Sequence, residues 1–213
     1  MALTLAQART LLRRRLQEPT TVQWTDAELT SLINLGVSDV QKVIQGPDPD
    51  AYITSADQNI VADQADYDLP TGAWWPVQVG VLDDDGDMVD LGDPITLVEA
   101  IEPSDSTSET RWVRYGRKIR LSPTPTESVT NGLRVYFIQS LAASVEGDAL
   151  PVPDPLHGLV VLYAEKWALG ETGEAADAVH KEIDREEARI PMWLRRTGAS
   201  ETIRPDVVKG YDR

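Results

Sequence analysis

Apolar side chains are most concentrated in residues 151–170, where they occupy almost every face of a helical projection. Asp154 is a favoured N-cap residue, Pro155 suits the first helical position, and a glycine follows the last turn. The segment is too short to cross a bilayer, which needs ~20 apolar residues. A helix that is apolar nearly all round has to be covered on several sides by other elements. The pattern therefore predicts a central core helix, with the core residues Leu159, Leu162 and Trp167.

Two helices are predicted near the N-terminus. The first opens with a capping box at Thr4 and runs to about Gln17, with apolar residues at helical spacing. The second opens with a capping box at Thr25. Trp24 precedes this cap and is expected to pack on Leu29 as a hydrophobic staple, so both side chains are assigned to the core.

A fourth helix is predicted after the core helix, from Glu174 to about Arg189. Its apolar seam includes the core residues Val179 and Ile183, and we expect Pro191 to kink or end it. Residues 197–213 contain glycines and a proline and have no helical period, which is typical of an extended tail.

Between residues 47 and 110, short β-compatible runs alternate with turn signals. The predicted strands are residues 67–69, 77–82, 88–91 and 95–101. This region is acidic and lacks Lys and Arg, which return at Arg111.

Basic strands are predicted next, as a hairpin around Gly116 and as residues 134–138 after a turn signal at Asn131 and Gly132. Because an acidic β segment is followed by a basic one, we expect the two to pair, either within the same sheet or across a subunit boundary.

Together these patterns predict an α+β protein. Residues 1–46 and 150–196 are expected to form a four-helix bundle from two N-terminal and two C-terminal helices. Residues 47–149 are expected to form a mainly antiparallel β insertion, and residues 197–213 an extended C-terminal tail.

The composition limits the possible chemistry. The 213 residues include no cysteine, which excludes a disulfide framework, a thiolate zinc site and a Cys nucleophile. The formal net charge of −15 argues against a protein that binds nucleic acid through its phosphates, because that affinity comes from Lys and Arg. The N-terminal residues lack the apolar run of a signal peptide or anchor, so we expect a cytoplasmic protein without a membrane partner.

The acidic run Asp83, Asp84, Asp85, Gly86 and Asp87 is the strongest candidate metal site. An EF-hand loop aligned on its glycine would place Val81 and Gly92 at the first and last ligand positions, so the pattern fails at both ends. We expect a solvated hairpin turn, with incidental cation binding as the alternative.

Catalytic motifs are also missing from the sequence. His157 and His180 lie on different predicted helices, and the chain has neither a G-x-S-x-G elbow nor a Gly-rich phosphate loop. The sequence therefore predicts no catalytic, cofactor-binding or metal-binding residues.

Several clusters are candidates for contact with other proteins. The Arg13–Arg15 cluster fits either the charged face of an amphipathic helix or a contact to phosphates or an acidic partner. Trp193, Arg195 and Arg196 combine residue types that are favoured at interfaces. Trp74 and Trp75 fit either the core of the β region or an exposed docking edge.

Six short motifs occur in a specific order along the chain. They are LLRRRL at 11–16, VQWTDAEL at 22–29, YDLP at 67–70, GRKIRLSP at 116–123, LRVY at 133–136 and the LPVPDPLH entry at 150 into a Tyr-Ala helix. In this order they resemble the head-to-tail adaptor proteins of tailed phages, of the short-tailed type, over roughly residues 1–195.

The resemblance implies a structural virion protein, also called a head-completion protein or tail accessory factor, and not an enzyme. Such adaptors form a homo-oligomeric ring, commonly a dodecamer, beneath the portal protein. The ring joins the portal to the tail or nozzle protein, and genomic DNA passes through its channel without specific binding. The implied location is the head–tail junction of the virion, after synthesis in the host cytoplasm, with no cofactor.

The resemblance also implies roles for two regions. The C-terminal region is expected to contact the portal or a neighbouring subunit through Trp193, Arg195, Arg196, Ile203, Arg204, Val207, Val208 and Tyr211. The β region is expected to face the tail or nozzle through Trp74, Trp75, Asp83, Asp84, Asp85, Arg111 and Arg114.

Two alternatives remain open at this point. One is a connector, stopper or tail terminator of a long-tailed phage, a group of proteins that is mostly helical. The other is an enzyme of nucleotide or DNA metabolism that holds a divalent ion with its acidic β loops.

Overall fold

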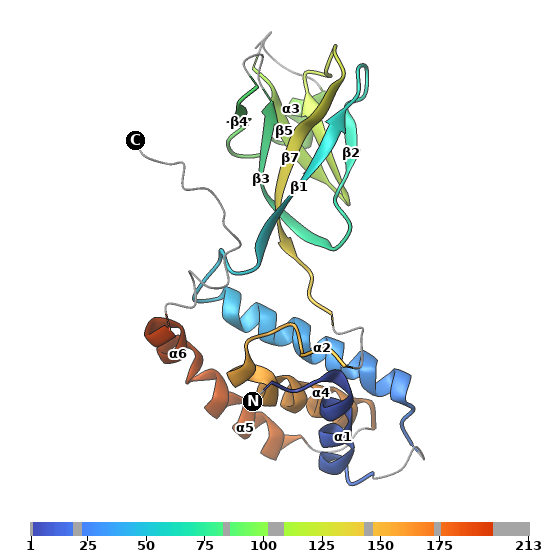
Figure 1. Ribbon diagram of the computed structural model, residues 1–213, viewed down its shortest axis with the longest axis vertical. Coiled ribbons are helices and arrows are strands. Elements are labelled where there is room, and N and C mark those ends of the chain that lie inside the picture. The colour runs from blue at the N-terminus through green and yellow to red at the C-terminus, as the bar shows by residue number, and fades with distance from the viewer. Residues whose placement is uncertain are drawn as a thin grey trace. The chain divides into compact units, whose positions relative to one another are not determined.

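The computed structural model describes residues 2–18, 23–82, 86–101, 109–142, 147–172 and 176–197 (Figure 1). They separate into two compact units. The helical unit contains the described residues up to Ala51 and those from Ser140 onward, and the β unit is Tyr52–Gln139. The β unit is thus inserted between two halves of the helical unit, and the predicted α+β class is confirmed.

The helical unit is organised around α4. Its elements are α1 (Leu5–Arg15), α2 (Asp26–Gln45), the 3₁₀ turn η1 (Asp154–Leu156), α4 (His157–Thr172), α5 (Asp177–Glu187) and α6 (Ile190–Thr197). α4 contacts α1, α2 and α5, and its contact with α2 is the most extensive between helices. Leu159 and Leu162 of α4 are buried, as a helix that is apolar nearly all round requires.

Both predicted N-terminal capping boxes are present. The Thr4 hydroxyl accepts a hydrogen bond from the Gln7 amide, and the Gln7 side chain accepts one from the Thr4 amide. Thr25 and Glu28 form the same reciprocal pair at the start of α2. Trp24 and Leu29, the two members of the predicted staple, are both buried.

α2 and α4 approach each other closely at Gly36. A Cβ atom on Gly36 would lie 2.3 Å from the carbonyl oxygen of Val160 and 3.2 Å from the amide nitrogen of Ala164. Real Cβ atoms do not come so near a carbonyl oxygen, so only glycine permits this approach of the two backbones.

The structure corrects the expected start of the core helix. Residues 154–156 form the 3₁₀ turn, and α4 begins at His157 instead of Pro155. Pro153, not Asp154, is the N-cap residue of this turn, and the turn has no side-chain capping hydrogen bond. His157 is buried, where its Nδ1 accepts the Leu3 amide at 2.8 Å and its Nε2 lies 2.7 Å from the Val152 carbonyl oxygen.

The expectation that Trp167 belongs to the core is also corrected. Its side chain is 41% exposed, and its indole Nε1 donates to the Asp39 carboxylate of α2 at 2.8 Å. Trp167 lies in the second half of α4, on a side that α1, α2 and α5 do not fully cover. The hydrogen bond to Asp39 satisfies its polar atom at the surface.

The predicted fourth helix is two helices. α5 ends at Glu187, and α6 begins at Ile190. Pro191 lies in the first turn of α6, where the backbone amides have no acceptor within the helix, so the missing N–H of proline costs no hydrogen bond. The break therefore precedes Pro191. In the part of the chain that the structure describes, α4, α5 and α6 follow the β unit, where the sequence predicted two helices. Val179 and Ile183 of α5 are buried.

The β unit consists of two antiparallel sheets. One has the order β1 (Ile53–Ile60), β7 (Val129–Gln139), β3 (Ala73–Leu82) and β4 (Met88–Asp90). The other has the order β2 (Asp66–Asp68), β6 (Lys118–Ser122) and β5 (Arg111–Tyr115). Both sheets contribute to a common core that includes Trp112, Ile119, Leu133, Val135 and Phe137.

Three predictions in this region were incomplete or wrong. Strand β1 was not predicted, although it pairs with β7 along its whole length. The segment predicted as a strand at 95–101 contains the helix α3 (Leu97–Ile101), which begins with a capping box between Thr96 and Glu99. Asn131 and Gly132 form no hairpin turn, because they lie inside β7 at a register shift, where Asn131 has φ 54°.

We predict that Gly36→Ala lowers the free energy of unfolding by about 1–3 kcal/mol, because the added Cβ forces α2 away from α4. Gly158→Ala in α4 is the matched control. A Cβ there meets nothing within 4 Å, so the substitution should be neutral or stabilise by up to about 1 kcal/mol. Chemical denaturation of both variants measures the difference, and equal stabilities would contradict the close approach of the two helices.

Candidate interaction surface

Trp74 and Trp75 lie on the surface of the β unit. Their side chains are 41% and 54% exposed, so of the two readings of the sequence the structure favours an exposed edge over the core. Both lie in the first half of β3, where a register shift against β7 interrupts the inward–outward alternation. β4 pairs only with residues Gly80, Val81 and Leu82, so it does not reach this half of β3.

Arg114 of β5 covers one face of the Trp75 ring. Its guanidinium carbon lies 3.7 Å from the ring centroid, which is a cation–π contact, and its Nε donates to the Gly116 carbonyl oxygen at 3.2 Å. The contact joins Trp75 and Arg114, two of the residues that the sequence analysis proposed for contacts of the β region. Trp and Arg are the residue types most often found at interface hot spots.

Arg114 leads into the tip of the β5–β6 hairpin. Gly116 makes this turn with φ 57°, a left-handed conformation that suits glycine, and Arg117 and Lys118 beside it are exposed. We call Trp75, Arg114, Arg117 and Lys118 the basic end of the β unit. Arg111, at the other end of β5, is exposed and lowers the pKa of Glu99, although less than the capping hydrogen bonds from Thr96 do.

Other charged side chains pair inside the sheets. Arg134 of β7 forms a two-pronged pair with Asp57 of β1 at 2.7 and 2.9 Å. Arg120 of β6 pairs in the same way with Asp66 of β2 at 2.7 and 3.0 Å. At these positions the predicted pairing of acidic and basic segments within one sheet is confirmed.

The hydrogen bonds from these two arginines change the ionisation of their partners. The hydrogen bond from Arg134 holds the pKa of Asp57 below its ordinary value, and that from Arg120 does the same for Asp66. Both carboxylates are therefore used to hold the β unit together and are not spare contact groups.

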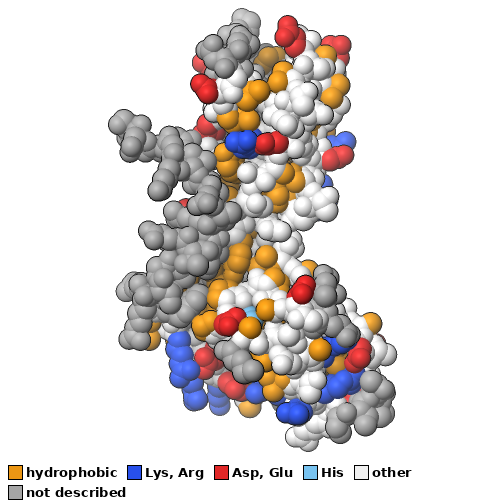
Figure 2. All heavy atoms as spheres, in the orientation of Figure 1, with side chains coloured by type: hydrophobic (Ala, Val, Ile, Leu, Met, Phe, Trp, Pro, Cys, Tyr) orange, Lys and Arg blue, Asp and Glu red, His pale blue; other side chains and the backbone are white. Residues whose placement is uncertain are grey.

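The arginine cluster of α1 also works mainly inside the protein. Arg13 donates to the Trp24 carbonyl oxygen at 2.9 Å and to the Asp26 carboxylate at 2.8 Å. Arg15 pairs with Glu165 of α4, which is buried, and with Glu182 of α5 at 2.8 Å. Figure 2 shows Lys and Arg side chains close to Asp and Glu side chains on the visible face of the helical unit. Arg13 and Arg15 are thus partly buried and pair with other elements of the helical unit instead of forming a charged outer face, whereas Arg14 is exposed.

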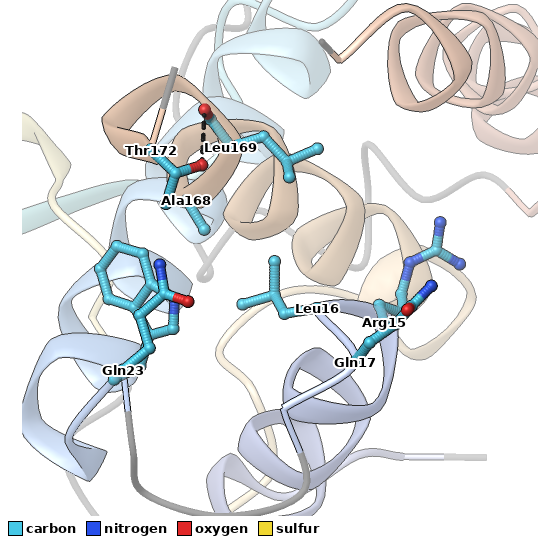
Figure 3. A pocket seen from close by; sticks show the side chains of 8 residues that line it. Arg15, Leu16, Gln17, Gln23, Ala168, Leu169 and Thr172 are labelled. Atoms are coloured by element: carbon cyan, nitrogen blue, oxygen red, sulfur yellow. Dashed lines mark hydrogen bonds between the residues drawn. The ribbon is translucent and has the colours of Figure 1, made fainter. Parts of the chain in front are cut away.

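A hollow of about 350 Å³ lies next to Arg15, between the end of α1, the start of α2 and the end of α4 (Figure 3). It is lined by Arg15, Leu16, Gln17, Gln23, Trp24, Ala168, Leu169 and Thr172. The Thr172 hydroxyl donates to the Leu169 carbonyl oxygen at 3.1 Å, so it is satisfied within α4. Because Arg15 is already paired with two carboxylates, the hollow offers no cation for an anionic ligand.

Several predicted contact residues lie outside the described residues. They are Asp83, Asp84 and Asp85 in the β region and Ile203, Arg204, Val207, Val208 and Tyr211 in the tail. The backbone of α6 includes Trp193, Arg195 and Arg196, but their side chains are not described.

Within the described ranges, no three His, Cys, Asp or Glu side chains are grouped so that they could hold a metal ion. Across the same residues, no helix is both long enough and apolar enough to span a bilayer.

Sequence reasoning missed one exposed apolar site. Val98 and Ile101 of α3 are largely exposed, and they were assigned to a strand. The signal that could have found the helix is the capping box of Thr96 and Glu99 at its start.

A family model described as SU10 adaptor protein matches residues 3–200 of the chain. The chain belongs to this family. Its members are phage head-to-tail adaptors, structural components of the virion, so the resemblance drawn from the sequence is confirmed at family level. No curated protein matches this adaptor. The match covers the residues of both the helical unit and the β unit.

We predict that Asp66→Asn destabilises the adaptor in a pH-dependent way. Because the folded-state pKa of Asp66 lies below its ordinary value of 3.8, the pair with Arg120 stabilises fully above that value and is lost as the pH falls through the lowered pKa. The variant should lose about 0.5–1 kcal/mol of unfolding free energy at neutral pH, a range set by the partial exposure of both side chains.

The measurement is urea denaturation at neutral pH and at roughly pH 3, where the difference from the parent should shrink. Asp68→Asn on the same strand is the control, because its carboxylate forms no ion pair within the described chain. A loss for Asp66→Asn that is equal at both pH values would contradict the assignment.

Proposed function

We propose that this adaptor forms a ring that joins the portal to the tail or nozzle around the DNA channel. The observation that supports the proposal best is the family match, which includes the β unit as well as the helices on both sides of it. The proposal includes a dodecameric ring and a phage of the short-tailed type, as the resemblance implies.

In this proposal the helical unit is the bundle that gives the ring its wall. Its polar groups are largely used internally, by the capping boxes, by Arg13 with Asp26, and by Arg15 with Glu165 and Glu182. Its core is formed by apolar residues from α1, α2, α4 and α5. A unit built in this way keeps its shape under load, which a connector requires.

The β unit carries the tail-facing contact in this proposal. Trp74 and Trp75 are large, exposed and rigid, and Arg114 is already oriented by its stacking on Trp75. Aromatic and arginine side chains that are ordered before binding lose little conformational entropy on docking. The C-terminal residues from Trp193 to Tyr211 would then contact the portal or a neighbouring subunit, with Ile203 and Val207 as apolar anchors.

The net charge fits a channel for DNA. A ring of chains that each carry a formal charge of −15 repels phosphates, so DNA passes without being held. The β unit argues against the alternative of a mostly helical connector or stopper from a long-tailed phage, because Tyr52–Gln139 is organised by two sheets.

We predict that Trp75→Ala weakens attachment of the tail or nozzle protein by at least about tenfold, because it removes a hot-spot side chain and the platform for Arg114. Val61→Ala is the control, since Val61 is an exposed apolar residue of the same unit that makes no such stack. Binding of purified tail protein to portal-bound adaptor can be measured by surface plasmon resonance. Unchanged affinity for Trp75→Ala would remove this surface from the tail contact.

We also predict that deleting residues 198–213 abolishes docking on the portal while the rest of the chain stays folded. Co-sedimentation with purified portal rings measures docking, and circular dichroism with thermal melting checks the fold. A truncated chain that docks with the affinity of the full chain would show that the portal contact lies elsewhere.

A further inference from the structure

The outer side of α1 carries a shallow groove of about 450 Å³, which we call the α1 groove. α1 packs on the rest of the helical unit through Leu5, Ala8 and Leu12, which are buried. The groove lies on the side of α1 that faces away from this core, and it is lined by Leu3, Ala6, Gln7, Thr10, Leu11 and Arg14.

The α1 groove combines apolar side chains with a cation. Leu3, Ala6 and Leu11 supply apolar surface, and the Thr10 hydroxyl is satisfied within α1 because it donates to the Ala6 carbonyl oxygen at 2.9 Å. Among the described residues no carboxylate forms an ion pair with Arg14, in contrast to the arginines on either side of it. The groove is therefore suited to an apolar side chain that has a carboxylate beside it.

A matching surface lies on α2 and α4. Trp167 of α4 is 41% exposed, and its indole is held in place by the hydrogen bond to Asp39 of α2. Leu35 is 43% exposed and lies one helical turn before Asp39, so it is on the same side of the α2–α4 pair. Glu171 follows Trp167 by one turn, is exposed and has no ion pair within the described part of the chain. We call Leu35, Trp167 and Glu171 the Trp167 face.

We propose that the Trp167 face of one copy of this chain docks in the α1 groove of the next copy. The inference rests on the proposed ring and deepens it by naming a contact between neighbouring helical units. The Trp167 indole enters the groove, and Glu171 comes to lie beside Arg14. The groove has room for the indole, because an engineered cavity of roughly 150 Å³ already holds benzene.

A second copy is the occupant that fits the groove. Trp167 is held against α2 by Asp39, and the groove faces away from α2 and α4, so Trp167 does not fill the groove of its own chain. Two chains with a net charge of −15 repel each other in most orientations, so an approach that brings Glu171 to Arg14 is favoured. An indole that is already oriented by a hydrogen bond loses little conformational entropy when it docks.

The geometry of this contact is compatible with a ring. The α1 groove and the Trp167 face are different surfaces of the same helical unit, so the contact is heterologous, and heterologous contacts that close generate rings. A two-fold pair in which each copy fills the groove of the other would stop at a dimer.

Photo-cross-linking of the full-length chain tests the contact. Benzoylphenylalanine, an aromatic photo-cross-linker, replaces residue 167, and the protein is mixed with unsubstituted, isotope-labelled chain. The mixture is irradiated both free and bound to portal rings. We expect mass spectrometry to find cross-links from residue 167 to labelled peptides that contain the α1 groove. When every chain carries the cross-linker, we expect a ladder of covalent oligomers beyond the dimer.

A filled groove should prevent the cross-link. We expect Ala6→Phe to lower the yield at least about tenfold, because the added ring occupies the space of the incoming side chain. Ala27→Phe is the matched control, because Ala27 is exposed in the first turn of α2 and does not line the groove. Its yield should equal that of the parent chain.

A charge swap tests the polar part of the contact. Arg14→Glu should lower the yield about three- to fivefold, as expected for an exposed ion pair. The same chain with Glu171→Arg added should regain the yield of the parent, because the two charges are exchanged. A loss that the second substitution does not restore would remove the Arg14–Glu171 pair from the contact.

Cross-links that avoid α1, or that join no second copy in either the free or the portal-bound protein, would overturn the inference. Covalent products that stop at dimers would overturn the ring-forming arrangement. Portal co-sedimentation separates this inference from the proposed function. If the chain docks on the portal without cross-linking to α1, the subunit contact is wrong and the adaptor role stands. If the unsubstituted chain does not dock on the portal, the proposed function fails, and the cross-links of the free chain decide the contact.

Discussion

The helical unit depends on the close approach of α2 and α4 at Gly36. The Val160 carbonyl oxygen occupies the space that a side chain would need, so the two backbones meet directly. α4 carries apolar residues on nearly every side. α2 covers one side of it through this contact, and α1 and α5 pack on other sides. α2 precedes the β unit in the chain and α4 follows it, so one packed helix pair holds the two segments between which the β unit is inserted.

Charged residues have two different uses in this adaptor. Inside the units they hold elements together, as Arg15 does between α1, α4 and α5, and as Arg120 and Arg134 do across the strands. At the β5–β6 hairpin Arg117 and Lys118 are exposed, on the same hairpin as Arg114, which stacks on the exposed indole of Trp75. A connector needs both uses, because it has to keep its own shape and bind its neighbours.

The sequence predicted those features that local chemistry decides. Both N-terminal capping boxes, the hairpin around Gly116 and the burial of Leu159 and Leu162 follow from side chains within a few residues of each other. Strand β1 could not be predicted, because its sequence ITSADQNI is mostly polar and its pairing with β7 is a contact over a long sequence separation.

Tertiary context explains the other differences. Trp167 follows the apolar pattern of α4, but its exposure depends on which sides of the helix the neighbours cover. For the candidate site, the sequence named Trp75 and Arg114 but could not show that they stack, because they lie on strands of different sheets. Nor could the sequence show which arginines pair within the sheets, as Arg120 does with Asp66 and Arg134 with Asp57.

Electron cryo-microscopy of the assembled head–tail junction tests the central claim most directly. The claim is that the helical unit supplies the scaffold and the β unit supplies contacts through Trp75 and Arg114. We expect a ring in which α2 and α4 remain paired at Gly36 while Trp75 and Arg114 are buried against another polypeptide chain. A reconstruction in which Trp75 and Arg114 face solvent, with no second chain in contact, would contradict it.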